Sequence, residues 1–162
     1  MNQESETGTE KAGTSRCGFV AIIGAPNAGK STLLNQLVGS KVAIVTHKVQ
    51  TTRARIRGIA MEGDTQIVFV DTPGIFKPKR RLDKAMVEAA WGGAGDADLI
   101  ILMVDAEHER AEDLERILEG LKEQGRKAIL VLNKVDTANR EKLLKLAQRL
   151  DATGLFTRTF MI

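Results

Sequence analysis

The sequence has 162 residues, of which 43% are hydrophobic and 28% charged, so it can build one domain with a packed core and is too apolar for a disordered chain. Its single cysteine, Cys17, excludes an internal disulfide and a cysteine zinc site. No apolar run is long enough for a transmembrane segment or a secretory signal. We therefore expect a cytoplasmic protein.

The net charge of +3 is too small to indicate a polyanionic partner. The distribution of charge is uneven, because residues 1–81 hold 12 basic and 6 acidic side chains, whereas residues 82–162 hold 12 and 15. Any polyanion would therefore meet more positive charge in the first half of the chain.

The first third of the chain combines a polar start with a strand and a helix. Residues 1–18 are polar and aperiodic, which predicts a disordered tail. The β-branched run at residues 19–23 predicts a buried strand, and residues 30–39 predict a helix that ends at its glycine. Residues 40–52 have no consistent period, so we expect a long loop, although the VAIV segment within it has strand character.

The remainder of the chain alternates strands and helices. Residues 53–61 and 65–70 predict a β-hairpin, and a helix that begins near Leu82 is expected to pack onto the sheet through Trp91. Further strands are expected over residues 99–104 and 128–132, each followed by a helix, and from residue 160 to the end. This order predicts an α/β fold of about six strands, mostly parallel with one antiparallel strand, and helices on both faces. Ligands then bind beyond the carboxyl ends of the strands.

The loop after the first predicted strand reads GAPNAGKS over residues 24–31 and matches the phosphate-loop pattern G-x-x-x-x-G-K-[ST]. Small residues let backbone N–H groups point inward around a phosphate, and the start of the following helix adds positive potential. Lys30 would contact the β and γ phosphates, and the Ser31 hydroxyl would bind Mg²⁺. The motif predicts the three-layer fold of the P-loop nucleoside triphosphatases.

Two further segments are expected to complete the phosphate and metal site. Asp71 follows an apolar strand in the Walker B arrangement and would hold Mg²⁺ opposite the phosphate loop, while Gly74 leaves its N–H free for a γ-phosphate. A threonine before Arg53 would complete the Mg²⁺ shell when a γ-phosphate is present. We assign that role to Thr52, with Thr51 as the alternative.

The segment NKVD at residues 133–136 follows a predicted strand and is suited to recognise guanine. The Asp136 carboxylate can accept hydrogen bonds from guanine N1–H and its exocyclic amine, whereas adenine offers an acceptor at N1 and no amine. The stem of Lys134 can cover the base plane, and Asn133 can tie this loop to the phosphate loop.

In this order and spacing, these motifs resemble the GTPase domain of the Era family of ribosome-assembly GTPases. Pro26 and Asn27 in the phosphate loop are similar to the group that contains Era, EngA and TrmE. The segment QTTR at residues 50–53, followed by Ala54 where EngA and TrmE usually have aspartate, resembles Era together with DTPG at residues 71–74.

The resemblance implies an Era-type domain over residues 19–162. Era-like proteins continue into a Ser-Ala base-contacting loop and an RNA-binding KH domain, and both would lie beyond Ile162. Ile75 stands where Ras-like switches place a water-orienting glutamine, so hydrolysis is expected to use cations instead. The resemblance implies a K⁺ ion beside Asn27. The alternative for Asn27 is a turn role in left-handed backbone conformation.

The expected site residues fall into three groups. The predicted catalytic residues are Asn27, Lys30, Thr52 and Gly74. The predicted nucleotide-binding residues are Asn27, Ala28, Gly29, Lys30, Ser31, Thr32, Asp71, Gly74, Asn133, Lys134 and Asp136. The predicted Mg²⁺ ligands are Ser31, Thr52 and Asp71. His47 and His108 lack suitably spaced partners and receive no role.

We predict a Mg²⁺-dependent switch that binds and hydrolyses GTP. The resemblance implies that, in the intact parent protein, nucleotide state controls binding to 16S ribosomal RNA in 30S subunit assembly. The alternatives are a nucleotide-gated RNA- or ribosome-binding module with negligible turnover and, disfavoured by residues 133–136, a P-loop ATPase. The clusters Arg53, Arg55, Arg57 and Lys77, Lys79, Arg80, Arg81 are interpreted first as solvated charge and second as contacts to RNA.

Overall fold

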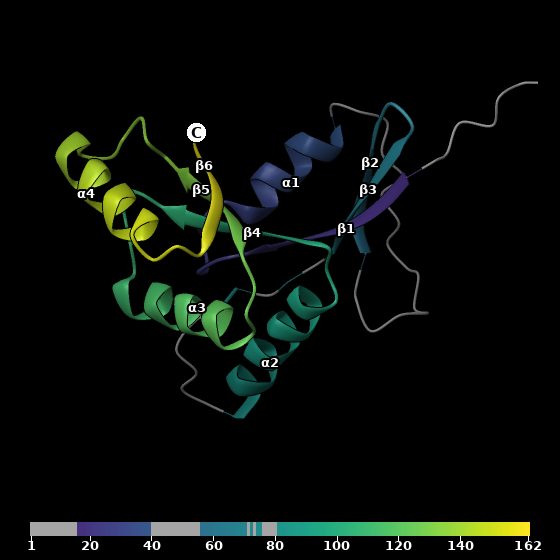
Figure 1. The fold of residues 1–162 in the computed structure, drawn as a ribbon, viewed down its shortest axis with the longest axis horizontal. Coiled ribbons are helices and arrows are strands. Elements are labelled where there is room, and N and C mark those ends of the chain that lie inside the picture. Colours follow the sequence, from purple (N-terminus) through teal and green to yellow (C-terminus); the bar gives the residue numbers. More distant parts are fainter. Residues whose placement is uncertain (1–15, 40–55, 71, 73, 76–80) are drawn as a thin grey trace, which may run out of the picture.

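The computed structural model describes residues 16–39, 56–70, 72, 74–75 and 81–162 (Figure 1). The predicted site residues Thr52 and Asp71, the alternative Thr51 and residues 1–15 of the predicted tail lie outside this set. The elements in chain order are β1 (Arg16–Ile23), α1 (Lys30–Gly39), β2 (Ile56–Glu62), β3 (Thr65–Val70), α2 (Arg81–Gly95), β4 (Leu99–Asp105), α3 (Ala111–Glu123), β5 (Ala128–Asn133), α4 (Arg140–Asp151) and β6 (Phe156–Met161).

The six strands form one sheet in the order β2-β3-β1-β4-β5-β6. All neighbouring pairs are parallel except β2 and β3, which form the predicted antiparallel hairpin. β1 lies inside the sheet, where Val20 pairs with Phe69 of β3 and with Leu99 of β4. The predicted fold class is therefore confirmed, and the carboxyl ends of β1, β3, β4 and β5 meet at one edge of the sheet.

The helices cover the sheet in two layers, and α1 lies across the sheet from α2 and α3 (Figure 1). On the α1 face, Leu34 and Val38 pack against Val20, Ile22 and Phe69. On the opposite face, α2, α3 and α4 pack against the alternate residues of the same strands. The members of that larger cluster include Ala21, Ile23, Ala90, Ala94, Leu102, Ile117, Leu121, Leu130 and Leu150. Every core strand is thus buried on both faces, as the apolar runs predict.

Two strand starts differ from the prediction. β1 begins at Arg16, three residues before the predicted start, because Arg16 and Cys17 pair with the start of β3 through the backbone despite their exposed side chains. β6 begins at Phe156 rather than at residue 160. β2 is described over Ile56–Glu62, and residues 53–55 of the predicted strand lie outside the described set. Backbone pairing with β5 extends β6 through polar, exposed residues that give no apolar signal.

Trp91, which is predicted to pack α2 onto the sheet, also contacts α3. A Cβ atom on Gly120 of α3 would lie 2.2 Å from Cζ2 of the Trp91 ring and 2.6 Å from its Cη2. The indole therefore occupies the space that a side chain at Gly120 would fill. The contact joins α2 to α3, and Trp91 still borders the larger core cluster.

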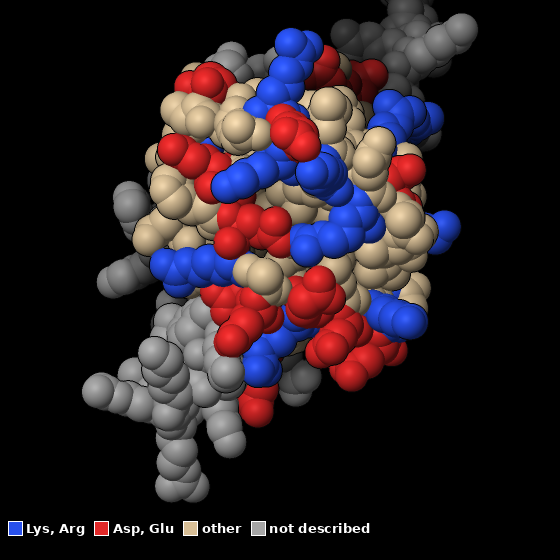
Figure 2. Space-filling model, turned by 90° about the vertical axis from the view of Figure 1, so that its left-hand side faces the viewer, with Lys and Arg blue, Asp and Glu red and all other residues tan. Residues whose placement is uncertain are grey.

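The side of the molecule at the left of Figure 1 carries interspersed charges of both signs (Figure 2). On α4, Lys145 pairs with Glu141 and Arg149 pairs with Glu109. Such interleaving gives no extended positive patch on this face among the described residues. The side chains of both predicted basic clusters lie outside the described set. In the part of the chain that the structure describes, no helix is long and apolar enough to cross a membrane.

The contact between Trp91 and Gly120 leads to a stability prediction. Gly120→Ala should lower the free energy of unfolding by about 1 to 3 kcal/mol, because overpacking against the indole outweighs the helix propensity that alanine adds. Gly92→Ala on α2 is the matched control, since a Cβ there meets nothing within 4 Å, and it should be neutral or stabilising by up to about 1 kcal/mol. Urea unfolding measures both, and equal effects of the two variants would contradict the packing described.

Candidate nucleotide site

The phosphate loop begins at Gly24, directly after β1. Any other residue at this position would require neighbouring atoms to shift. A Cβ at Gly24 would lie 2.3 Å from the carbonyl oxygen of Met103 in β4. Gly29, at the other end of the loop, has φ of +99°, and its Cβ would lie 2.3 Å from Nδ2 of Asn133. Both motif glycines are therefore required by close approach to neighbouring strands.

The middle of the phosphate loop is a tight turn. Asn27 has φ of 64° and is exposed, which is the left-handed conformation that asparagine tolerates better than most residues. The backbone of Asn27 thus has the left-handed conformation that the turn interpretation predicts. Ala28 is buried, and its N–H donates to the carbonyl of Ala25 at 3.3 Å.

The lysine of the phosphate loop spans the loop from the first turn of α1. Lys30 Nζ donates to the carbonyl oxygens of Gly24 at 3.0 Å and Ala25 at 2.7 Å. Ser31 and Thr32 follow it and are exposed, and the first turn of α1 contains no acidic residue. A cation and the N–H groups of a helix start therefore lie together, which favours an anion at this point.

The segment after β3 is fixed to the phosphate loop. The buried Thr72 hydroxyl donates to the carbonyl of Ile22 in β1, and Ile75 N–H donates to the carbonyl of Gly24 at 3.0 Å. A Cβ at Gly74 would lie 3.1 Å from Pro26, so Gly74 borders the phosphate loop. Ile75 is fully buried in the core, so its side chain does not face the loop.

The loop after β5 is joined directly to the phosphate loop. Asn133 Nδ2 donates to the carbonyl oxygen of Ala28 at 2.9 Å, across 105 residues of sequence. This confirms the predicted tie between the two loops. Lys134 has φ of 62°, and Asp136 lies exposed beyond it. The backbone N–H of Val135 donates to the carbonyl of Ile162 at 3.2 Å.

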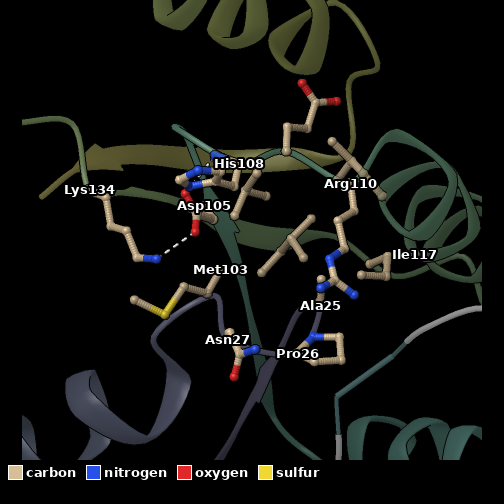
Figure 3. Close-up of a pocket in the computed structure, with 13 residues that line it drawn as sticks. Ala25, Pro26, Asn27, Met103, Asp105, His108, Arg110, Ile117 and Lys134 are labelled. Atoms are coloured by element: carbon tan, nitrogen blue, oxygen red, sulfur yellow. Dashed lines mark hydrogen bonds and ion pairs between the residues drawn. The ribbon is translucent and has the colours of Figure 1, made fainter. Parts of the chain in front are cut away.

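A cavity of about 490 Å³ lies between the phosphate loop, the end of β4 and α3. Ala25, Pro26 and Asn27 line it at one end, and Asp105 and Lys134 face each other at the other end (Figure 3). Its remaining lining comes from β4, α3 and the loop between them. The cavity therefore joins the two loops that the sequence assigns to phosphates and base.

Comparison with known proteins agrees with this geometry. Residues 19–134 match the family described as 50S ribosome-binding GTPases. The chain belongs to this family.

Within this GTPase family, the chain is similar to proteins named GTPase Era. It is 67% identical over 147 residues to the protein from Rhizobium meliloti, covering 91% of this chain and 47% of that protein. With the Brucella melitensis protein it is 60% identical over 162 residues, covering 99% and 52%. The chain thus spans about half the length of the curated relatives it matches.

Solved Era structures share the fold. An Era protein from Aquifex aeolicus bound to GDP and AlF4⁻ superposes with a TM-score of 0.70 at 39% identity, covering 91% of this chain and 51% of that one. Era in complex with MgGDPNP and nucleotides 1506–1542 of 16S ribosomal RNA gives a TM-score of 0.71 at 39% identity, with the same coverage.

The structure also places residues at the site that the sequence analysis missed. Asp105, the last residue of β4, pairs with Lys134 at 2.6 Å (Figure 3). A carboxylate that directly follows a buried strand is the signal that could have identified it. Thr72 was quoted only as part of the DTPG motif, yet its hydroxyl attaches that segment to β1.

Among the described residues, His108 and the metal-binding side chains add no second centre. His108 is exposed, with Nδ1 3.5 Å from Glu107 Oε2. Over the described ranges, no group of three or more His, Cys, Asp or Glu side chains is placed to hold a metal ion. Of the predicted Mg²⁺ ligands, only Ser31 is among the described residues.

The Asn133 tie leads to a prediction about the stability of the phosphate loop. Asn133→Ala should lower the free energy of unfolding by about 1 to 2 kcal/mol and speed amide exchange in residues 25–29, because the Ala28 carbonyl loses its partner. Hydrogen exchange and urea unfolding measure the two effects. Asn139→Ala is the control, because it removes an N-cap of α4 that accepts from Glu141 and Lys142. It should cost about 1 kcal/mol while exchange in the phosphate loop stays unchanged.

Proposed function

We propose that this chain binds GDP and GTP through the two joined loops and hydrolyses GTP. The observation that carries the proposal is the hydrogen bond from Asn133 to the Ala28 carbonyl. It fixes a loop with donors for phosphate beside a loop with an acceptor for a base. Phosphate donors beside a base acceptor are what a nucleoside phosphate requires.

Base selection is assigned to Asp136 and Lys134. The exposed Asp136 carboxylate is available to accept from guanine N1–H and the exocyclic amine, and adenine would leave it unpaired. Lys134 supplies a methylene stem for the base plane while its ammonium is held by Asp105.

Phosphate binding is assigned to the backbone of residues 27–29, to Lys30 and to the start of α1, including Thr32. The Ser31 hydroxyl in the first turn of α1 is an exposed oxygen ligand of the type that Mg²⁺ prefers. Asp71 and Thr52 complete the predicted metal set. When bound, Mg²⁺ neutralises charge that develops on the phosphates.

Hydrolysis in this proposal depends on cations. The buried Ile75 cannot orient water, which leaves charge stabilisation by Lys30, the N–H of Gly74 and a K⁺ ion beside Asn27. The buried apolar residue at this position also favours the second candidate, a nucleotide-gated RNA- or ribosome-binding module with negligible turnover.

The role in ribosome assembly is proposed for a protein of the length of the relatives. The Era structure with nucleotides 1506–1542 of 16S ribosomal RNA supports an RNA partner in the small, 30S subunit. The family description names the 50S subunit instead. We prefer the 30S assignment because the chain is 60–67% identical to proteins named GTPase Era, and the RNA in the Era complex is 16S ribosomal RNA. A soluble, cytoplasmic location follows from that partner.

Base recognition can be tested by calorimetric titration in Mg²⁺ and KCl. The chain should bind GDP and not ADP, and Asp136→Asn should weaken GDP binding at least about 100-fold, because the amide presents a donor where guanine requires acceptors. Asp151→Asn, an exposed carboxylate at the end of α4, is the matched control and should bind GDP normally. Equal binding of ADP and GDP would contradict guanine specificity and favour a P-loop ATPase.

Turnover can be tested by multiple-turnover phosphate release from GTP. The wild-type chain should release phosphate in KCl and more slowly in NaCl, and Lys30→Ala should lower the rate about 100-fold through loss of its charge at the phosphates. Lys142→Ala on α4 should retain the wild-type rate. Tight GTP binding without release in either salt would favour the nucleotide-gated binding module over the enzyme.

A further inference from the structure

The end of β4 and the loop that follows it contact residues 133–137 at three points. We call this segment, which includes NKVD, the base loop. The N–H of Ala106 donates to the Asn133 carbonyl at 2.9 Å. Lys134 Nζ donates to Asp105 Oδ2 at 2.6 Å, and the Thr137 hydroxyl donates to Glu107 Oε2 at 2.8 Å. Residues 105–107 therefore contact Asn133, Lys134 and Thr137 of the base loop.

Asp105 uses both of its carboxylate oxygens. Oδ1 accepts from the backbone N–H groups of Glu107 at 3.0 Å and His108 at 2.9 Å, which closes the turn after β4. Oδ2 is left for Lys134. The Asp105 side chain is only 13% exposed and the Lys134 side chain 39%. A well-fixed carboxylate thus holds the end of a longer, partly exposed side chain.

The backbone of Lys134 makes this contact more informative. Its φ of 62° places a lysine in the left-handed region, which is uncommon for a long side chain and costs about 1 kcal/mol or more. The contacts around it maintain this conformation. In Figure 3 the Lys134 side chain extends toward Asp105, so the pair fixes both ends of the lysine stem.

Both partners are charged at neutral pH. Partial burial acts to raise the pKa of the Asp105 carboxyl, but hydrogen bonds from Lys134 and from the N–H groups of His108 and Glu107 outweigh it, and the pKa lies below its ordinary value. The hydrogen bond to Asp105 raises the pKa of Lys134. The pair is therefore ionised between the ordinary pKa values of aspartate and lysine, and loses its attraction only outside that range.

We propose that Asp105 is a positioning residue of the base site. By holding the ammonium of Lys134, it keeps the lysine stem in place to cover the plane of a guanine base. This inference rests on the proposed function. It predicts that the affinity for the guanine part of a nucleotide depends on Asp105. The affinity for the phosphates should not depend on Asp105, because the phosphate loop has its own contacts through Lys30 and Asn133.

Two substitutions separate this role from a purely structural one. Asp105→Asn keeps an oxygen that accepts from Glu107 and His108 and removes the charge that holds Lys134. Lys134→Met keeps the stem, removes the ammonium and does not touch the turn. Asp98→Asn is the matched control, because Asp98 precedes the opposite end of β4 and accepts from Phe19 N–H at 2.7 Å.

The test measures the binding of GDP and of inorganic pyrophosphate to each variant by separate calorimetric titrations. Asp105→Asn should weaken GDP about five- to tenfold, the loss expected for one partly exposed charged hydrogen bond, and change pyrophosphate less than twofold. In the Lys134→Met background, Asp105→Asn should have no further effect. Asp98→Asn should bind both ligands as the wild type does.

Three outcomes would overturn the inference. If the wild type binds GDP and Asp105→Asn binds it with the same affinity, the inference about Asp105 is wrong and the proposed function is unaffected. Equal loss of GDP and pyrophosphate would assign Asp105 a structural role. A wild-type chain that binds pyrophosphate but not GDP, or neither ligand, would overturn the proposed base site and the inference together. If Asp105→Asn fails to fold, Lys134→Met gives the same GDP-to-pyrophosphate comparison with the turn intact.

Discussion

The close approach of Gly24 to β4 is the constraint on which the site depends. β1 lies between β3 and β4 and must leave the sheet beside the Met103 carbonyl, where a Cβ would lie 2.3 Å from that oxygen. The carbonyl of the same glycine accepts from Ile75 N–H and from Lys30 Nζ, each at 3.0 Å. One residue without a side chain therefore brings the end of β1, the segment after β3 and the cation of α1 together.

The second half of the site is built on the neighbouring strand pair. β4 and β5 run parallel, so Asp105 pairs in register with Asn133 at their common end. Asn133 then reaches back to the phosphate loop, and Asp105 holds Lys134. The strands beneath are buried on both faces, and their close-packed core of low compressibility fixes the positions from which the two loops leave the sheet. The two loops are thus held by backbone register first and by side-chain contacts second.

Local sequence was sufficient to predict those elements whose ends are marked by an apolar run, a terminal glycine or a motif. Residues 65–70 and 30–39 match β3 and α1, because apolar runs and a terminal glycine mark their ends. The phosphate loop and NKVD were found in the same way, and their junction through Asn133 was anticipated. The start of β6 at Phe156 was missed because its polar residues pair through the backbone alone.

The contacts that the sequence could not indicate are those between distant side chains. Trp91 lies on α3 because Gly120, 29 residues later, leaves room for its ring. Asp105 stands in the acidic segment DAEHE, which by composition alone reads as solvated charge, and only the register of β4 with β5 places it beside Lys134. The left-handed conformation of Lys134 is likewise a result of its surroundings, since lysine has no intrinsic preference for it.

The arrangement of charge along the site follows from these tertiary contacts. At the phosphate loop, Lys30 and the acid-free first turn of α1 present positive charge and N–H donors. At the base loop, Asp105 neutralises Lys134, so that Asp136 remains the carboxylate exposed at the end of the NKVD motif. In the proposed site, donors at the phosphate loop and the Asp136 acceptor thus lie on two joined loops, and Asp105 balances the charge of Lys134 beside that acceptor.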